Sequence, residues 1–419
     1  MPKEGDDDWQ LPYERYPFAT CELGGGIQVT HHRRPIIKGM DIYAISLIKL
    51  GDGNNLVGYY MYHGGTNKIG QRSTLQESKA TGYPNDYAIL SYDFQGPISE
   101  YGEIRDQYRL LNLLHLFLEE NQETFATMTA VDAINPVTRE DMASLRYGMR
   151  TNGRSGFVFI NHYQRLAKLE DVKDVVIDTG NVVFPSFDVC GDISFFFPFH
   201  MDLGGNDLTY ATAQPICKQD NTYFFVAIPG IKPEYQVNGN VYKPEVGKDF
   251  VLTVNEVNIV TLSWAEAQFV RKIKNTVYIG ENCDLYGLED VVACVGEGDY
   301  TYYVWKGKCF ATHTINRKSQ EVVVTMREVD MPKLDQIYYE ELHMGGEREV
   351  VWREIRVSGS NGMVEINYIG DVAQIYADGK LIADDYYYGK VWRVPARLLF
   401  GKTCYLAVSE LRDDFYREF

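Results

Sequence analysis

Two stretches near the start of the chain place polar side chains where strand-like runs end. Glu22 ends the run Tyr16–Glu22 and precedes three glycines, while His63 and Asn67 flank a double glycine after the aromatic run Gly58–Tyr62. A carboxylate at a strand end can attack an anomeric carbon and form a covalent glycosyl-enzyme. Imidazole and amide groups can bind sugar hydroxyls. The pattern predicts one shared active face at the carboxyl ends of buried parallel strands.

Each of these residues also has a plainer interpretation. Glu22 can be a surface residue before a flexible loop. Asn67 and its neighbouring glycines can be present only because a turn requires unusual backbone angles. The basic stretch His31–Arg34 is expected to be a solvated loop or a salt-bridge partner, because adjacent histidines point apart and no carboxylate lies at ligand spacing. For Tyr386–Tyr388 we expect packing at the edge of a β-sandwich rather than stacking on a glycan. No metal site is predicted.

The first 120 residues have a β-α-β-α pattern that would position these side chains. Asp41 is predicted to be the N-cap of a first helix, with Gly51 just past its end. A second helix is predicted at Glu103–Glu119, where four apolar residues are spaced to bury one face. These four are Leu110, Leu111, Leu114 and Phe117. The loop of roughly forty residues between Tyr62 and this helix is long enough to be functional.

After about residue 145 short strand-like runs replace the helical periodicity. The turn pairs Asn238-Gly239 and Asp378-Gly379 predict hairpins. The runs are Phe157–Asn161, Lys173–Asp178, Ser194–Phe197, Thr222–Ile228, Asn258–Trp264, Tyr300–Phe310, Glu321–Arg327, Met363–Tyr368 and Val372–Ala377. We therefore expect two antiparallel β-sandwich or jelly-roll domains, at 123–290 and 291–419, after an α/β part at 1–122.

The composition limits the class of partner. A net charge of -17 and a pI near 5.0 argue against nucleic acid or an anionic membrane, which require clustered Lys and Arg. Seven scattered cysteines without a Cys-x-x-Cys pair indicate neither a zinc site nor a disulfide framework. The acidic start Met1–Asp8 has no apolar core and does not resemble a signal peptide. A neutral small molecule or glycan fits better.

Three segments, in this order, resemble glycoside hydrolase family 35, the β-galactosidases. They are Pro17–Pro35, Tyr59–Asn67 with its His-Gly-Gly-Thr-Asn motif, and Ser91–Gly102 with its Tyr-Asp-Phe and Pro-Ile-Ser-Glu-Tyr-Gly motifs. Two segments of the β region, Gly156–Arg165 and Ile366–Leu381, resemble the domains that follow the barrel in this family. The resemblance therefore extends over most of the chain.

The resemblance implies a (β/α)8 barrel, retention of anomeric configuration, two catalytic glutamates and no cofactor. The expected fold is mostly β, with the last two βα units of such a barrel before two β-sandwich or jelly-roll domains. Glu22 matches the family's nucleophile, and His63, Asn67, Tyr92 and Phe94 would contact a β-galactoside in an oligosaccharide or glycan. Phe94 stands where the family often has a tyrosine, so a β-glucosaminide remains an alternative substrate.

The family's acid/base glutamate lies in an Asn-Glu-x-Tyr-Gly type motif that does not precede Glu22. The pair Asn255-Glu256 lies deep in the β region and lacks the following Tyr-Gly. We therefore expect a fragment that is inactive alone, with the missing amino-terminal barrel part as its partner. The alternatives are a carbohydrate-binding accessory protein and one half of a split glycosidase. Localisation is open, and an extracytoplasmic site is plausible if an export signal is missing.

Overall fold

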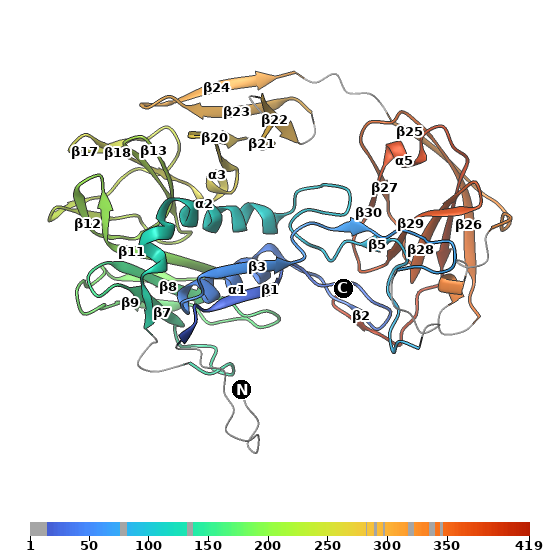
Figure 1. Cartoon of the computed structure of the whole chain (residues 1–419), viewed down its shortest axis with the longest axis horizontal. Coiled ribbons are helices and arrows are strands. Elements are labelled where there is room, and N and C mark those ends of the chain that lie inside the picture. Colours follow the sequence, from blue (N-terminus) through green and yellow to red (C-terminus); the bar gives the residue numbers. More distant parts are fainter. Residues whose placement is uncertain are drawn as a thin grey trace, which may run out of the picture. The chain divides into compact units, whose positions relative to one another are not determined.

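The computed structural model describes residues 15–75, 82–131, 137–281, 283–288, 291–295, 298–316, 322–334, 340–343 and 347–419. It is mostly β, with 44% strand and 12% helix. The chain forms two compact units, each from three separate stretches (Figure 1). Unit 1 comprises Met1–Leu23, Gly39–Tyr60 and Gln107–Asn316, and unit 2 comprises Gly24–Lys38, Met61–Asp106 and Arg317–Phe419. The domain boundaries 1–122, 123–290 and 291–419 stay a prediction, and Met1–Asp8 lies outside the described residues.

Unit 1 begins with the predicted β-α-β order. Strands β1 (Ala19–Gly24) and β3 (Leu56–Tyr60) form a two-stranded sheet and are joined through helix α1 (Gly39–Gly51). The Asn55 amide donates to the Phe18 carbonyl, and Gly58 lies against the Cys21 carbonyl. Because the residue numbers of these two contacts rise together along both strands, the pair has a parallel register.

The prediction that these two strands are buried is wrong. Leu23 is the only buried residue of β1, and Leu56 and Tyr60 of β3 are exposed. In the part of the chain that the structure describes, neither strand has a second neighbour in its sheet. A two-stranded sheet cannot cover both of its faces, so apolar side chains remain in contact with solvent.

The helix boundaries differ from the prediction at both helices. Helix α1 starts at Gly39, so Asp41 lies in its first turn, where the helix dipole favours a carboxylate, rather than at the N-cap. Gly51 is the last residue of α1 instead of the first one beyond it. Helix α2 runs over Asp106–Ala126, which is later at both ends than predicted. Its predicted apolar face is confirmed, because Leu110, Leu111, Leu114 and Phe117 are all buried.

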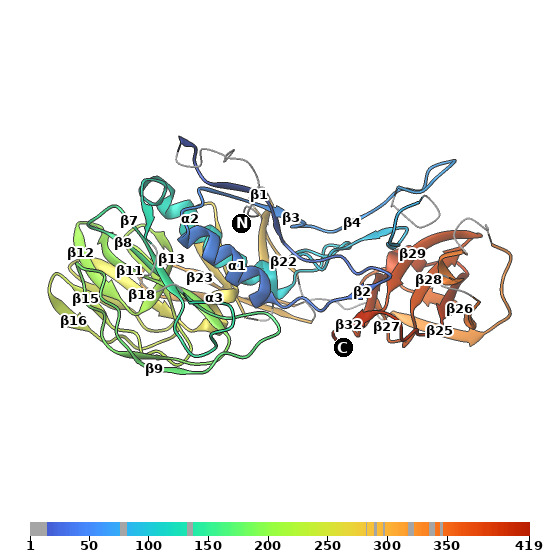
Figure 2. The same cartoon turned by 90° about the horizontal axis from the view of Figure 1, so that it is seen from below.

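Both helices pack on the β structure of unit 1. Helix α1 contacts β8 (Gly156–His162) and β11 (Ile193–Leu203), as Figure 2 also shows. From α2, the ring of Phe117 lies 4.9 Å from that of Phe157 and 4.6 Å from that of Phe196, measured between centroids. Edge-on and tilted aromatic contacts of this kind add to the stabilisation from burial. The apolar faces of the two helices are therefore covered by antiparallel strands.

Besides the β1–β3 pair, the described residues of unit 1 form three larger sheets and two short hairpins. The seven-stranded sheet has the order β16 (Asn240–Tyr242), β15 (Tyr235–Val237), β12 (Asn206–Ala211), β11, β8, β7 (Tyr147–Thr151), β6 (Thr129–Val131). The second sheet is β13 (Ala213–Gln219), β14 (Thr222–Ala227), β18 (Val257–Leu262), β17 (Leu252–Val254). The third is β19 (Val270–Ile273), β20 (Thr276–Gly280), β23 (Tyr300–Trp305), β24 (Phe310–Ile315). The hairpins are β9 (Val172–Val175) with β10 (Phe187–Val189) and β21 (Asp284–Leu288) with β22 (Val291–Val295), and the short helix α3 is Trp264–Gln268.

Most predicted strands of unit 1 are present, with two corrections. The run Tyr300–Phe310 is not one strand, because a turn at Lys306–Cys309 folds it into the β23–β24 hairpin. The expectation of purely antiparallel sheets is also wrong at one place, where β14 and β18 pair in parallel. A long connection joins these two strands and contains β15, β16 and β17, which makes a parallel neighbour possible. The Asn238-Gly239 hairpin is confirmed, with φ of 49° and 82° at its two turn residues.

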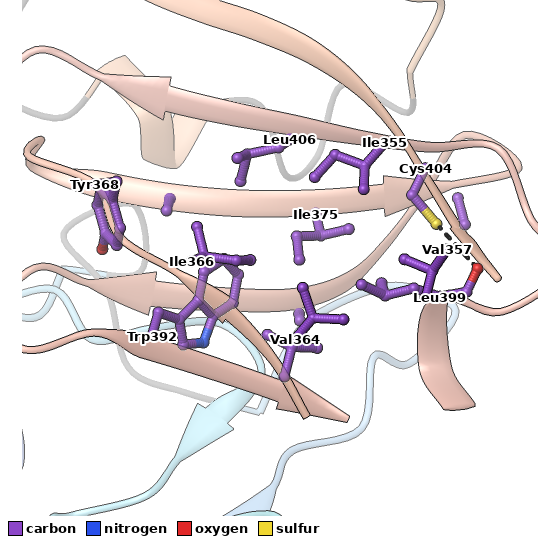
Figure 3. Packing of buried hydrophobic residues seen from close by; sticks show 14 of the residues in the cluster. Ile355, Val357, Val364, Ile366, Tyr368, Ile375, Trp392, Leu399, Cys404 and Leu406 are labelled. Atoms are coloured by element: carbon purple, nitrogen blue, oxygen red, sulfur yellow. Dashed lines mark hydrogen bonds between the residues drawn. The ribbon is translucent and has the colours of Figure 1, made fainter. Parts of the chain in front are cut away.

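Unit 2 has a five-stranded sheet facing a two-stranded one. The larger sheet has the order β25 (Val323–Glu328), β26 (Val350–Ser358), β31 (Cys404–Ser409), β28 (Val372–Ala377), β29 (Lys380–Tyr386), and β27 (Met363–Ile366) pairs with β30 (Trp392–Pro395). Val322 of the predicted Glu321–Arg327 strand is not part of β25, and Glu321 lies outside the described residues. Short helices occur at Glu340–His343 (η3) and Ala396–Leu399 (α5). Figure 3 shows Ile355, Ile375 and Leu406 of the larger sheet in one core with Val364, Ile366 and Trp392.

A buried arginine ties the start of unit 1 to its seven-stranded sheet. Arg150 of β7 is fully buried and donates to the carbonyls of Leu50 (3.0 Å), Asn54 (2.9 Å) and Met128 (3.2 Å). Its guanidinium also lies 4.0 Å from the ring centroid of Phe125. A buried carbonyl that loses a hydrogen-bond donor is costly, so these bonds favour the folded state.

We predict that Arg150→Met lowers the free energy of unfolding by about 3 kcal/mol or more, because several buried carbonyls lose their donor at once. Arg154→Met is the matched control, since Arg154 is exposed near the same hairpin. Urea unfolding followed by tryptophan fluorescence measures both variants. Equal stability of the two variants would contradict the role given to Arg150.

Candidate functional site

Two of the motif loops lie side by side in unit 2. The short strand β4 (Gly65–Thr66) pairs with β5 (Ser91–Tyr92). The Asn67 amide donates to the Leu90 carbonyl at 2.7 Å, and the Gly64 amide donates to the Ile98 carbonyl at 2.9 Å. The His-Gly-Gly-Thr-Asn stretch is therefore held along both sides by the long loop that follows it.

The glycines after Glu22 pack tightly against this pair of loops. A Cβ atom on Gly26 would lie 2.0 Å from the carbonyl oxygen of Phe94, and one on Gly64 would lie 2.7 Å from the Glu100 amide nitrogen. Only glycine permits such close backbone approach. The side-chain amide of Gln95 also donates to the Pro35 carbonyl at 3.0 Å. Three stretches that are distant in sequence thus form one layer of loops.

Asp93 organises the turn that follows Tyr92. Its Oδ1 accepts from the Glu100 amide at 2.6 Å, and its Oδ2 accepts from the Gln95 amide at 3.2 Å and from the Arg105 guanidinium at 2.6 Å. Phe94 and Gln95 have φ of 57° and 51°, backbone angles that residues other than glycine rarely adopt. Such strain persists only where the surroundings fix the backbone, and it is concentrated at functional sites.

Four of the five predicted site residues are brought together in unit 2. The rings of Tyr92 and Phe94 lie 4.7 Å apart between centroids, and the two side chains are half-buried. His63 is exposed, and its Nδ1 contacts the carbonyl oxygen of Gly64. Asn67 is half-buried, and its side-chain amide makes no hydrogen bond to any residue that the structure describes.

The fifth predicted residue, Glu22, lies on β1 of unit 1 and is exposed. Its side chain has no hydrogen bond or ion pair with any residue that the structure describes. Its role as nucleophile stays a prediction.

Glu100 is a site residue that the sequence reasoning missed. The Thr66 hydroxyl donates to its Oε1 at 2.5 Å. Burial raises the pKa of Glu100 from an ordinary 4.5 to about 7, with the nearby carboxylates of Asp384 and Asp93 as further, smaller causes. The sequence contained a signal, since Glu100 lies within the Pro-Ile-Ser-Glu-Tyr-Gly motif, but nothing local indicated its contact with Thr66.

Asp384 is the second residue that was missed. From β29 its carboxylate accepts the backbone amides of Ile89 at 2.6 Å, of Leu90 at 3.0 Å and of Ser91 at 2.8 Å. Burial raises its pKa to about 6, against the effect of these three hydrogen bonds. No sequence pattern near residue 384 could have indicated this contact, because its partners lie almost 300 residues earlier in the chain.

The basic stretch after the glycines is only partly as expected. Arg34 is a salt-bridge partner as predicted, with its guanidinium 2.5 Å from Asp371 Oδ1. The prediction of a solvated loop is wrong for Arg34 and His31, which are both buried. Asp371 is itself buried and also binds Arg348 at 2.7 Å and Arg412 at 2.8 Å. The Asp371 carboxylate, together with the carbonyls of Asp371 and Tyr387 that accept from Arg34, compensates the burial of this arginine.

Two further sequence features are accounted for by packing and turns. Tyr386 is buried at the end of β29, which confirms packing for this member of Tyr386–Tyr388. Asn255 and Glu256 form the turn between β17 and β18, with φ of 46° and 67°.

No described helix is long and apolar enough to cross a membrane. Within the described ranges there is also no cluster of three or more His, Cys, Asp or Glu side chains that could hold a metal ion.

Comparison with known families supports the interpretation of the motifs. Residues 10–117 of the 419-residue chain match the family described as glycosyl hydrolases family 35. The matched segment contains the three stretches whose motifs resemble this family. It includes Glu22, His63, Asn67, Tyr92 and Phe94, and it also includes Glu100. The match extends to Phe117 in α2, so the loops of the candidate site lie inside the glycoside hydrolase segment, whereas Asp384 lies outside it.

We predict that Asp384→Asn weakens the attachment of the 89–91 backbone, because an amide offers one acceptor oxygen and no charge to three donors. Hydrogen exchange at Ile89, Leu90 and Ser91 should become at least about tenfold faster, in line with the loss of one or two charge-assisted hydrogen bonds. Asp378→Asn is the control, because Asp378 is exposed in the β28–β29 turn, where asparagine is equally suited. If hydrogen exchange at these three amides is unchanged in Asp384→Asn, the carboxylate does not hold the 89–91 backbone in place.

A second prediction concerns the pH dependence of stability. Because Glu100 keeps its proton up to about pH 7 when folded and only to about 4.5 when unfolded, the folded state loses stability as pH rises between these values. Glu100→Gln imitates the protonated acid, so its unfolding midpoint should fall less over this range than that of the wild type. Some slope will remain, since the pKa values of Asp384 and Asp385 are also raised by burial, to about 6 and about 7. Thermal unfolding across this pH range measures the difference, with exposed Glu119→Gln as control.

Proposed function

We propose that this chain is the carboxyl-terminal part of a retaining exo-β-galactosidase, which removes terminal β-linked galactose from oligosaccharides or glycans. The gathering of His63, Asn67, Tyr92 and Phe94 in one layer of loops carries the proposal. An aromatic pair offers an apolar surface to a sugar face, and the Asn67 amide is available to a hydroxyl. The match of the same segment to a glycoside hydrolase family supports the reaction class.

In the proposed mechanism Glu22 attacks the anomeric carbon and forms a covalent galactosyl-enzyme. A second glutamate protonates the departing oxygen, and it then takes a proton from the water that hydrolyses the intermediate. Two inversions at the same carbon retain its configuration. This chemistry requires neither a metal ion nor an organic cofactor.

The second glutamate is not provided by a recognisable motif of this chain. The Asn-Glu-x-Tyr-Gly type motif is absent before Glu22, and Asn255-Glu256 forms a hairpin turn. We therefore propose that the isolated chain does not cleave ordinary galactosides, because their leaving groups depart as poor, unprotonated alkoxides. Phe94 lacks the hydroxyl that the family often supplies, so β-glucosaminides are the second substrate class to test.

A carbohydrate-binding accessory protein is the second candidate function. One observation favours it: the apolar faces of α1 and α2 are already covered by β strands of unit 1, so these elements are packed without further barrel strands. A third candidate is one half of a split glycosidase, with the missing carboxyl group on another polypeptide. The accessory protein would bind galactose without forming a covalent intermediate, which separates it from both catalytic candidates.

We predict that the chain releases dinitrophenol slowly from a dinitrophenyl β-galactoside, whose leaving group needs no proton, and that Glu22→Gln lowers this rate by at least about 100-fold. Glu119→Gln, an exposed substitution on α2, should retain the rate. A nitrophenyl substrate with a poorer leaving group should be cleaved much more slowly by both active proteins.

If Glu22→Gln cleaves the activated substrate as fast as the wild type, the assignment of the nucleophile is wrong. If the wild type binds galactose in a titration followed by nuclear magnetic resonance but shows no release even of dinitrophenol, the accessory function replaces the catalytic one.

A further inference from the structure

Two cysteines lie on one face of the β21–β22 hairpin of unit 1. The strands pair antiparallel, with Asp284 opposite Val295 and Leu285 opposite Cys294. Cys283 immediately precedes β21. Cys283 and Leu285 pack in the same small core, which places Cys283 on the side of the hairpin that carries Leu285 and the opposite residue Cys294. The hairpin register thus makes the two cysteines diagonal neighbours.

The surroundings hold the two thiols together. Cys283 is only 2% exposed and packs with Leu285 and Tyr300, and the partly buried Cys294 packs against the same small core. The Cys283 and Cys294 thiols lie close enough that each affects the pKa of the other. The Cys283 thiol also lies 3.7 Å from the Thr301 carbonyl oxygen, which it can reach as a donor. A disulfide brings the two Cβ atoms to about 4 Å, and cysteines that share one face of a hairpin and one small core are placed for such a bond.

We propose that Cys283 and Cys294 form a disulfide bond when the protein folds in the presence of a low-molecular-weight disulfide such as oxidised glutathione. This inference does not depend on the proposed hydrolase function. It concerns a single hairpin cross-link, and the scattered cysteines still indicate no disulfide framework.

The reaction is a pair of thiol–disulfide exchanges. The Cys294 thiolate attacks one sulfur of oxidised glutathione and forms a mixed disulfide, and one glutathione thiolate leaves. The Cys283 thiolate then attacks the Cys294 sulfur, and the second glutathione thiolate leaves. The two protons released by the cysteines protonate these thiolates, so the protein is oxidised by two electrons and one glutathione disulfide is reduced to two thiols.

Burial determines when this bond can form. It raises the pKa of the Cys283 thiol to about 12 and raises that of Cys294 as well. Little thiolate is then present in the folded protein at neutral pH, so exchange after folding is slow. The bond should form while the hairpin is still open during folding, and it should afterwards be protected from reduction by the same burial.

The position of the cross-link gives it a structural consequence. Asp284, the next residue, forms ion pairs with Arg109 of α2 at 2.9 Å and with Arg271 of β19 at 2.7 Å. A disulfide at Cys283 restrains the backbone that presents this carboxylate. The cross-link would therefore stabilise the attachment of α2 to the β structure of unit 1.

The test is to refold the full chain with a mixture of oxidised and reduced glutathione at about pH 8, where exchange is efficient. Remaining thiols are blocked, and the protein is digested without reduction and analysed by mass spectrometry. We expect a peptide pair joined through Cys283 and Cys294, lighter by two hydrogen atoms than its reduced form. The exposed Cys21 and Cys309 should be recovered blocked or as glutathione adducts.

Recovery of Cys283 and Cys294 in blocked form, or joined to other cysteines, would overturn the proposal. Cys294→Ser should abolish the cross-linked pair, and Cys309→Ser, a substitution of an exposed cysteine, should preserve it. A reducing agent should lower the thermal unfolding midpoint of the oxidised wild type by several degrees and leave that of Cys294→Ser unchanged. Equal midpoints for the oxidised and reduced wild type would contradict the stabilising role.

Discussion

The carboxylate of Asp384 fixes the backbone from which the candidate site of unit 2 is built. It accepts three consecutive amides, of Ile89, Leu90 and Ser91, just before the chain reaches Tyr92. Ile89 and Leu90 precede β5 and belong to no described helix or strand, so their amides have no partner in a regular ladder. A buried amide without an acceptor is costly, so the loop can be ordered only where such an acceptor is present. The site loops are thus supported from the carboxyl-terminal sheet.

A second carboxylate does the same for the glycine-rich stretch. Asp371, which immediately precedes β28, binds Arg34 together with Arg348 and Arg412, and all four side chains are at least nine-tenths buried. Buried charges of this kind contribute little net stability when all are present, but removal of one partner leaves the others uncompensated. The ion pairs of Asp371 therefore act mainly by fixing the positions of the segments that they join. It ties residues 24–38 to the sheet that also holds the 89–91 backbone.

These contacts explain which features the sequence could predict. Local periodicity was sufficient for the buried face of α2, for most of the strands and for the two hairpin turns with Asn-Gly and Asp-Gly. Motif order predicted four candidate site residues that lie in unit 2, and their roles stay predictions. The exposure of β1 and β3 and the burial of Arg34 depend on neighbours that are remote in sequence, and neither appears in a local pattern. Asp384 and Asp371 resemble ordinary polar residues near strands until their partners are known.

The contacts of Asp93 and Asp384 indicate which parts of the proposed enzyme this chain can hold in place by itself. Retaining hydrolysis requires correctly placed binding groups and two carboxyl groups roughly 5–5.5 Å apart. Within unit 2 internal contacts hold the segments that carry the proposed binding groups: Asp93 holds the turn at Phe94, and Asp384 holds the backbone before it. Neither contact involves a further barrel strand. Under the proposed function, an added polypeptide would therefore need to supply the second carboxyl group and the remaining barrel wall. The loops that would recognise the sugar are already held in place by the β structure of the chain itself.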